Sequence, residues 1–157
     1  MKTTFSLCAL SLLAVLFAAP AGAKSRGCEG SPGAGAARLG VAATNLRNAK
    51  GEVAFTVYAN DRKRFLAKGG KLARIRVPAA APTTVACFWL PAGQYAIAIY
   101  HDENGDRDFN RTLWIPKEGF GFSNDAPTTL GLPSLDKVRF ALPGGGTTMR
   151  MRMRYRR

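Results

Sequence analysis

Residues 85–100 read VACFWLPAGQYAIAIY, and this stretch decides the fold class. Residues 85–90 are apolar on both faces, which is typical of a central strand in a sheet. Residues 91–93 (PAG) then provide a turn signal, and from Tyr95 to Tyr100 the larger Ile97 and Ile99 alternate with alanines. A strand, a tight turn and a second strand with a period of two predict a β-hairpin.

The same period of two recurs in short runs along the rest of the chain, separated by turns rich in Gly and Pro. No stretch has a sustained helical period, although residues 61–72 have room for a helical turn or two. The pattern predicts an all-β protein, an antiparallel β-sandwich of about seven to eight strands. The additional strand candidates are residues 39–43, 53–58, 74–77, 138–142 and 147–155.

The N-terminus has the pattern of a secretory signal peptide over residues 1–23. Lys2 supplies the positive charge, residues 5–19 are apolar, and residues 21–23 (AGA) form a small-residue cleavage site. Residues 24–37 are rich in Gly, Ala and Ser, so we expect a flexible leader, followed by a single domain over residues 38–157. The apolar run is too short to span a bilayer, so we expect a periplasmic or secreted protein with no transmembrane segment after cleavage.

The composition describes a basic globular protein. Among 157 residues, 23 Lys and Arg stand against 10 Asp and Glu, and 46% of the residues are hydrophobic. Enough apolar side chains are present to form a core, so the charge does not indicate a disordered tail. Because export separates the protein from nucleic acid, and no aromatic-flanked basic motif is present, we expect no nucleic-acid partner.

The predicted export determines how the cysteines are interpreted, because disulfides form in oxidising compartments. Cys8 leaves with the signal peptide, which leaves Cys28 and Cys87 to form one disulfide in an oxidising compartment. The alternative is a buried Cys87 and a free Cys28 in the leader. His101 is the single histidine and no CxxC motif is present, so no nucleophile–base pair is visible and we expect no enzyme and no catalytic residue.

Residues 101–111 (HDENGDRDFNR) concentrate four of the ten acidic residues. The oxygen-bearing side chains of Asp102, Asn104, Asp106 and Asp108 fall on alternate positions, so a curled loop could direct them at one Ca²⁺ ion. The residues do not match an EF-hand loop, because Arg107 stands at its Gly position. The alternative is a solvated hairpin turn at Asn104-Gly105 without a cation. Ca²⁺ is the only cofactor that the sequence brings into consideration.

Residues 113–127 (LWIPKEGFGFSNDAP) lack any period and are rich in aromatic residues, Gly and Pro. A long connection of this kind is usually functional or packed on itself. We expect Trp114, Phe120 and Phe122 to fold back as an apolar plug. The alternative is a groove for a small ligand.

Residues 147–157 (TTMRMRMRYRR) place methionines on one face of a strand and arginines on the other. We expect the methionines in the core and a solvated arginine face that protects the sheet edge. The alternative is a row of guanidinium groups that binds the phosphates of lipid or lipopolysaccharide, formed by Arg150, Arg152, Arg154 and Arg156.

Three segments also carry a resemblance to a known family: residues 90–106 (LPAGQYAIAIYHDENGD), 115–127 (IPKEGFGFSNDAP) and 132–140 (LPSLDKVRF). Over residues 39–142 the chain resembles the bacterial secreted domain of unknown function 2141. The resemblance implies an antiparallel β-sandwich of immunoglobulin-like or transthyretin-like type. It implies no activity, and no catalytic residue is carried over from it.

Together these observations predict an exported, non-catalytic β-sandwich, a structural or accessory binding module of the cell envelope. The alternatives are a basic module that binds an anionic surface and a Ca²⁺-stabilised ligand-binding module. The sequence names no partner; an anionic envelope lipid and another envelope protein are both candidates.

Overall fold

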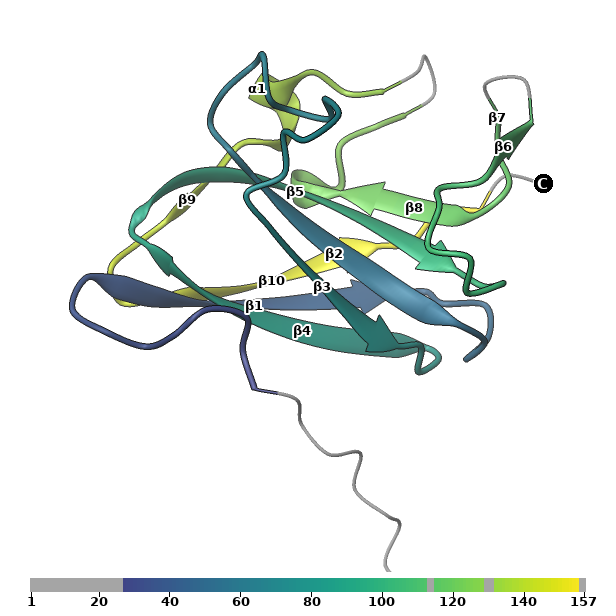
Figure 1. The fold of residues 1–157 in the computed structure, drawn as a ribbon, viewed down its shortest axis with the longest axis horizontal. Coiled ribbons are helices and arrows are strands. Elements are labelled where there is room, and N and C mark those ends of the chain that lie inside the picture. Colours follow the sequence, from purple (N-terminus) through teal and green to yellow (C-terminus); the bar gives the residue numbers. More distant parts are fainter. Residues whose placement is uncertain (1–26, 113–114, 129–131, 156–157) are drawn as a thin grey trace, which may run out of the picture.

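The computed structural model describes residues 27–112, 115–128 and 132–155 and is almost entirely β (Figure 1). The predicted signal peptide lies outside the described residues. No helix in the described part of the chain has the length and apolar character needed to span a bilayer. The strands are β1 (Ala36–Thr44), β2 (Glu52–Ala59), β3 (Ala73–Pro78), β4 (Thr83–Pro91), β5 (Gly93–Asp102), β6 (Arg111–Thr112), β7 (Ile115–Pro116), β8 (Gly119–Phe122), β9 (Phe140–Leu142) and β10 (Thr147–Arg152), and the helices are η1 (Ser123–Asp125) and α1 (Leu135–Val138).

Two sheets face each other, which confirms the predicted β-sandwich. One sheet has the strand order β10-β1-β4, and the other has the order β3-β2-β5-β8, with β9 pairing to the first residues of β5. Strands β6 and β7 form a separate two-stranded ribbon. The two main sheets hold eight strands, as expected.

The named strand pairs are antiparallel with one exception, which the sequence did not predict. Strand β10 runs parallel to β1, with Val41 opposite Met149 and Ala43 opposite Met151. A turn over residues 143–146 carries the chain from β9 in one sheet to β10 in the other. Because the chain changes sheets there, β10 joins β1 without a hairpin, and antiparallel pairing is not imposed.

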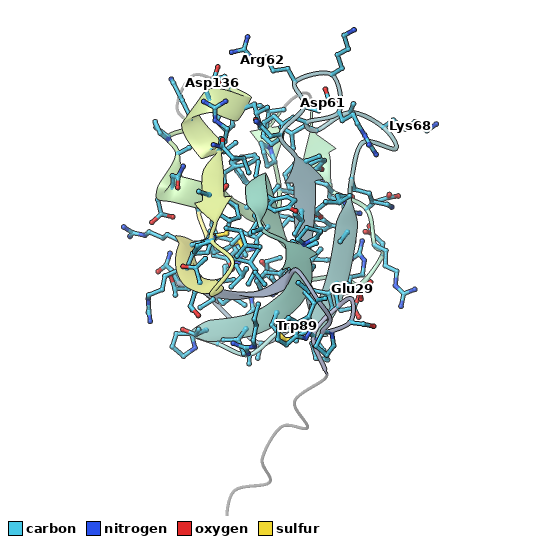
Figure 2. All side chains as sticks on the ribbon, turned by 90° about the vertical axis from the view of Figure 1, so that its left-hand side faces the viewer. Glu29, Asp61, Arg62, Lys68, Trp89 and Asp136 are labelled. Atoms are coloured by element: carbon cyan, nitrogen blue, oxygen red, sulfur yellow. A yellow bond between two sulfur atoms is a disulfide. The ribbon has the colours of Figure 1, made fainter. Side chains whose placement is uncertain are left out.

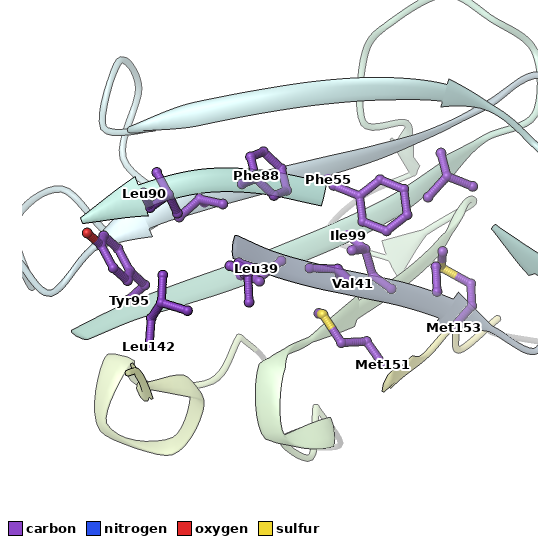
Figure 3. Packing of buried hydrophobic residues seen from close by; sticks show 14 of the residues in the cluster. Leu39, Val41, Phe55, Phe88, Leu90, Tyr95, Ile99, Leu142, Met151 and Met153 are labelled. Atoms are coloured by element: carbon purple, nitrogen blue, oxygen red, sulfur yellow. The ribbon is translucent and has the colours of Figure 1, made fainter. Parts of the chain in front are cut away.

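The core between the sheets is built by the predicted alternation (Figure 3). Phe55 on β2 and Ile99 on β5 face Leu39 and Val41 on β1, and each is no more than 2% exposed. Met151 belongs to the same cluster and is fully buried, so the methionine face of the last strand lies in the core as expected.

Strand β4 departs from its predicted place. The apolar residues 85–90 suggested a central strand, but β4 is an edge strand of the three-stranded sheet. Phe88 is fully buried between the sheets, whereas Val85 is 65% exposed on the outer side. Strand β4 is therefore apolar on both faces although only one face is buried in the core and the other is exposed.

A second apolar cluster covers the outer face of the five-stranded sheet. Phe120 and Phe122 of β8 pack there with Tyr58, Tyr100 and the buried residues of α1. Both phenylalanines are therefore packed, which agrees with the predicted apolar plug and not with a ligand groove. Trp114 lies outside the described residues. Residues 61–72 form consecutive turns that also contribute side chains to this cluster.

The described part of the segment predicted as a leader is attached to the domain. Cys28 forms a disulfide with Cys87 of β4, as the sequence suggested. Glu29 pairs with β4 through two main-chain hydrogen bonds, its N–H donating to Cys87 and its carbonyl accepting from Trp89. Strand β1 begins at Ala36, inside the predicted leader and before the predicted domain start at residue 38.

The predicted strand over residues 138–142 is shorter in the structure. Val138 ends helix α1, and only residues 140–142 form β9. Leu135 and Val138 are both buried in the outer cluster. A single helical turn with its two apolar residues three positions apart gives no periodic signal that sequence reasoning could detect.

Candidate functional site

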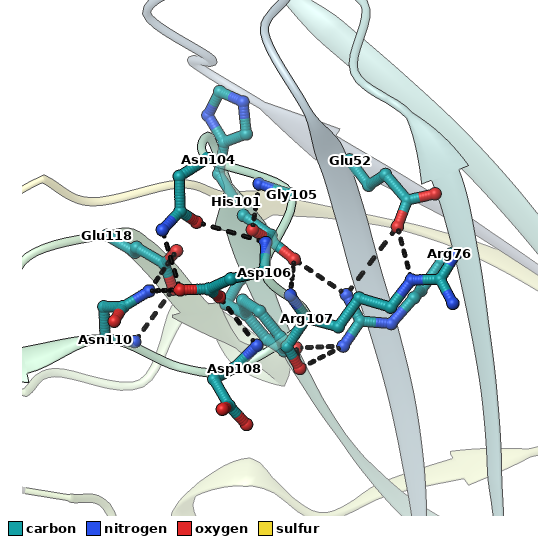
Figure 4. Close-up of polar contacts among 12 residues, drawn as sticks. Glu52, Arg76, His101, Asn104, Gly105, Asp106, Arg107, Asp108, Asn110 and Glu118 are labelled. Carbon is teal, nitrogen blue, oxygen red and sulfur yellow. Dashed lines mark hydrogen bonds and ion pairs between the residues drawn. The ribbon is translucent and has the colours of Figure 1, made fainter.

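The acidic segment that follows β5 forms a hydrogen-bonded loop at one end of the five-stranded sheet (Figure 4). Asp102 is the last residue of β5 and is fully buried. Its Oδ1 accepts a hydrogen bond from the Gly105 N–H at 2.8 Å, and its Oδ2 accepts one from the Arg107 N–H at 2.8 Å. One buried carboxylate thus holds both arms of the turn.

The counter-charge for Asp102 comes from a strand that is not its neighbour. Arg76 lies on β3, separated from β5 by β2, and its Nη1 is 3.1 Å from Asp102 Oδ2. The same guanidinium donates to the Tyr100 hydroxyl and to the Arg107 carbonyl. Arg76 therefore ties the edge of the sheet to the acidic loop.

Asp106 lies at the exposed tip of the loop and collects three donors. Its Oδ2 accepts hydrogen bonds from the Asn104 and Asn110 side-chain amides, each at 2.7 Å, and its Oδ1 accepts one from the Asp108 N–H. These donors, the Asn110 amide first among them, lower the pKa of Asp106. The three donors thus fix the orientation of the carboxylate.

Glu118 reaches the same loop from the start of β8. It is 6% exposed, and it accepts hydrogen bonds from the Asn110 N–H at 3.1 Å and from the Asn110 side-chain amide at 3.4 Å. Burial is the main cause that raises the pKa of Glu118, because an ionised carboxylate loses hydration there.

The loop thereby gathers three carboxylates. One oxygen each of Asp102, Asp106 and Glu118 lies within 4.8 Å of the others. Hard cations such as Ca²⁺ take carboxylate oxygens as ligands, while Asn104 and Asn110 turn their amide nitrogens toward Asp106. The arrangement can hold a divalent cation between the turn and the start of β8.

The structure brings together only part of the predicted ligand set. Asp102 and Asp106 converge, and Asn104 supports Asp106 through its amide nitrogen. The Asp108 side chain points away from the cluster, and only its main-chain N–H joins the network (Figure 4). Sequence reasoning missed Glu118, which is twelve residues beyond Asp106. The register of β5 and β8 pairs His101 with Gly119, so recognition of GFGF as a strand would have placed Glu118 next to Asp102.

His101 is used structurally. It is fully buried, its Nε2 is 2.7 Å from the Lys50 carbonyl and its Nδ1 is 2.7 Å from the Tyr155 hydroxyl. A carbonyl can only accept, so Nε2 carries a proton and donates to Lys50, while Nδ1 is hydrogen-bonded to the Tyr155 hydroxyl. Both ring nitrogens are therefore committed to fixing the chain on either side of β5.

Comparison with known proteins gives one family. The model of a family described as an uncharacterized protein conserved in bacteria, DUF2141, matches residues 41–150. The chain belongs to the DUF2141 family. No curated protein and no solved structure matches it. The DUF2141 match spans both sheets and the complete acidic loop, so the carboxylate cluster lies inside the region that defines the family match.

The arginines of residues 147–157 in this DUF2141 member have two different roles. Arg150 and Arg152 are exposed on the side of β10 that faces away from the core. Arg154 instead donates to the main-chain carbonyls of Asp125 and Ala126, so its guanidinium serves to join the strand to η1. Arg156 lies outside the described residues.

A groove of about 630 Å³ runs beside β3, the edge strand of the DUF2141 domain. Its charged lining is mixed, because Glu52 lies 3.9 Å from Arg76 and 3.8 Å from Arg107. Four basic residues stand against two acidic ones in the groove lining, and two of the basic residues, Arg76 and Arg107, are bonded to the acidic loop.

Proposed function

We propose that this DUF2141 protein is an exported, non-catalytic β-sandwich module of the bacterial cell envelope. The observation that carries the proposal is the disulfide between Cys28 and Cys87. Disulfides persist in oxidising compartments such as the periplasm and are rare in the bacterial cytosol. The signal-peptide pattern over residues 1–23 supports the same compartment independently.

The non-catalytic part of the proposal rests on how the reactive side chains are used. The single histidine of the sequence has both ring nitrogens bonded in the interior. Cys28 and Cys87 are joined to each other, so neither is a free thiol nucleophile. General acid–base and nucleophilic catalysis need a base within reach of a nucleophile, and no such pair involves His101 or these cysteines.

Expression of the full chain in a bacterial host with a periplasm tests export. The proposal predicts that the protein is recovered from the periplasm, starting at Lys24, with Cys28 and Cys87 linked. A chain retained in the cytoplasm with an intact N-terminus and two free thiols would contradict it.

A second candidate function, stabilisation by Ca²⁺, is favoured by the carboxylate cluster. Asp102, Asp106 and Glu118 present oxygens within 4.8 Å of one another, and the ion pairs of the described residues include no Lys or Arg bound to Asp106 or Glu118. A divalent cation would compensate this charge and supply the electrostatic stabilisation that burial denies to Glu118.

Thermal melting with CaCl₂ or with EDTA tests the cation site. A ligand that binds only the folded state at about 100 times its Kd stabilises it by about 2.7 kcal/mol, so we expect a higher Tm in CaCl₂. The substitutions Asp106→Asn and Glu118→Gln should abolish the increase. Asp108→Asn is the matched control, because the Asp108 side chain lies outside the cluster, and it should keep the increase. An unchanged Tm in CaCl₂, or an equal increase in all variants, would reject Ca²⁺ binding at this loop.

A further inference from the structure

The two sheets differ in what covers their outer faces. The outer face of the five-stranded sheet is covered by the second apolar cluster, with α1 and residues 61–72. No helix or strand of the described residues packs on the outer face of the three-stranded sheet, and Val85 on that face is 65% exposed. Cys87 alternates with Phe88 and therefore carries the disulfide to Cys28 on this outer side. We call this face the basic sheet face and define it by Arg38, Val85, Trp89, Arg150 and Arg152.

Strand alternation fixes the direction of these side chains. Leu39 on β1, Met151 on β10 and Phe88 on β4 point into the core, so the residues that alternate with them point outward. The register then sets the neighbours, with Ala42 of β1 between Arg150 and Val85, and Arg38 opposite Trp89. Cations and apolar side chains thus lie side by side on one face of the sheet.

The charge of this face is uncompensated. Arg38, Arg150 and Arg152 are exposed, and none of the ion pairs formed among the described residues includes any of them. The strand residues of β1, β4 and β10 include no Asp or Glu. Two acidic residues are bonded to these strands from outside: Asp125 accepts a hydrogen bond from the Arg152 main chain, and Glu29 pairs with the edge of β4 through its own main chain and lines the groove beside β3.

The apolar component lies among the cations. Trp89 is partly exposed next to the disulfide, at the end of the molecule opposite to Arg62 and Lys68 (Figure 2). Tryptophan and short aliphatic side chains beside arginines suit the interface of a lipid bilayer, where an apolar body meets phosphate groups. A sheet face whose charged side chains are all cationic complements an extended anionic surface better than it complements a small ligand.

We infer that the basic sheet face docks this protein onto the surface of an anionic phospholipid bilayer. The guanidinium groups pair with lipid phosphates, and Val85 and Trp89 contact the interfacial region. This contact is peripheral, since it uses one sheet face and no spanning segment. The inference stands apart from the proposal of a non-catalytic exported module, because vesicle binding is measured on purified protein.

Cosedimentation with vesicles tests the inference. The disulfide-bonded chain is mixed with vesicles of phosphatidylcholine alone or of phosphatidylcholine with an equal part of phosphatidylglycerol. Each basic residue near an anionic surface contributes about 1 kcal/mol, or about fivefold in partitioning. The triple variant Arg38→Gln, Arg150→Gln, Arg152→Gln should therefore bind the anionic vesicles roughly 100-fold more weakly than the unchanged protein.

The matched control removes the same charge elsewhere. Lys63, Arg64 and Lys68 are exposed in the turns of residues 61–72, on the cover of the other sheet, and their replacement by Gln should leave binding within a few-fold. Val85→Ser should weaken binding at low salt and at high salt alike, because it removes an apolar contact. Equal losses in the two triple variants would show that only net charge matters and would overturn the inference. Absence of binding by the unchanged protein, or self-association through Val85 in place of vesicle binding, would also overturn it.

Discussion

Arg76 and Asp102 form an ion pair of 3.1 Å across an intervening strand, joining the edge of the five-stranded sheet to the turn that follows β5. The Asp102 side chain is fully buried and the Arg76 side chain is 17% exposed. Asp102 also accepts two main-chain hydrogen bonds from the acidic loop, so this pair links the loop to the edge of the sheet. Loop geometry and sheet stability are therefore coupled in this protein.

Removal of the arginine should be costly. Arg76→Met leaves the Asp102 carboxylate buried without its counter-charge, and breaking such a pair costs about 3–5 kcal/mol. We expect the free energy of unfolding, measured by urea denaturation, to fall by about that amount. Arg62→Met is the control, because its pair with Asp136 is exposed on both sides and contributes about 0–1 kcal/mol (Figure 2). Similar losses in the two variants would contradict a special role for the buried pair.

The turn before β2 requires glycine at position 51. Gly51 has φ +67°, and a Cβ there would lie 1.8 Å from the Asp102 carbonyl oxygen. Gly51→Ala must displace the main chain at the start of the acidic loop, so we expect a loss of more than about 3 kcal/mol in unfolding free energy. Gly69→Ala has a similar φ of +73° and nothing within 4 Å, so it isolates the conformational cost of about 1 kcal/mol. Equal losses at the two positions would exclude the predicted collision.

The disulfide should contribute through the chain entropy of the unfolded state. Cys28 and Cys87 are 59 residues apart, and closing a loop of that length stabilises the folded protein by about 4 kcal/mol. Replacing both cysteines by serine should lower the urea midpoint of unfolding. The core between the two sheets contains neither cysteine, so the variant should still fold. Adding a reductant to the unchanged protein should reproduce this shift, and a midpoint insensitive to both treatments would contradict the prediction.

Tyr155 should make the free energy of unfolding depend on pH in the alkaline range. Burial is the main cause that raises the pKa of Tyr155 above its ordinary value of 10.0, so the folded state holds the phenol proton more tightly than the unfolded chain. The stabilisation is complete below pH 10 and is lost as the pH rises through the folded-state pKa. The advantage of the unchanged protein over Tyr155→Phe should therefore shrink when urea denaturation is repeated at increasing alkaline pH. Tyr58, Tyr95 and Tyr100 are common to both proteins, and a constant difference would refute the prediction.

The sequence predicts the sandwich because its alternation records burial directly. Phe55, Ile99 and Met151 each fall on the inward face that period-two reasoning assigned to them. The cysteine pairing could also be predicted, because the predicted removal of residues 1–23 leaves two cysteines for one bond. Periodicity alone did not reveal the parallel pairing of β10 with β1 or the edge position of β4, because both depend on which strands become neighbours after the chain changes sheets.

Only part of the candidate site could be predicted from the sequence, because local spacing does not show which strands become neighbours. Asp102 and Asp106 belong to one local turn, which sequence spacing can detect. Glu118 joins them only through the pairing of β8 with β5, a long-range register that no local pattern encodes. The separate role of Arg154 likewise depends on the position of η1, whose carbonyls it binds.

The intact mass and N-terminal sequence of the protein recovered from the periplasm test the central proposal most directly. An exported module should begin at Lys24 and have a mass two hydrogens below that of the reduced chain, because Cys28 and Cys87 are linked. The disulfide and the signal-peptide pattern lead to this result by separate routes. A full-length chain beginning at Met1, found in the cytoplasm with Cys28 and Cys87 both reactive toward a thiol reagent, would contradict it.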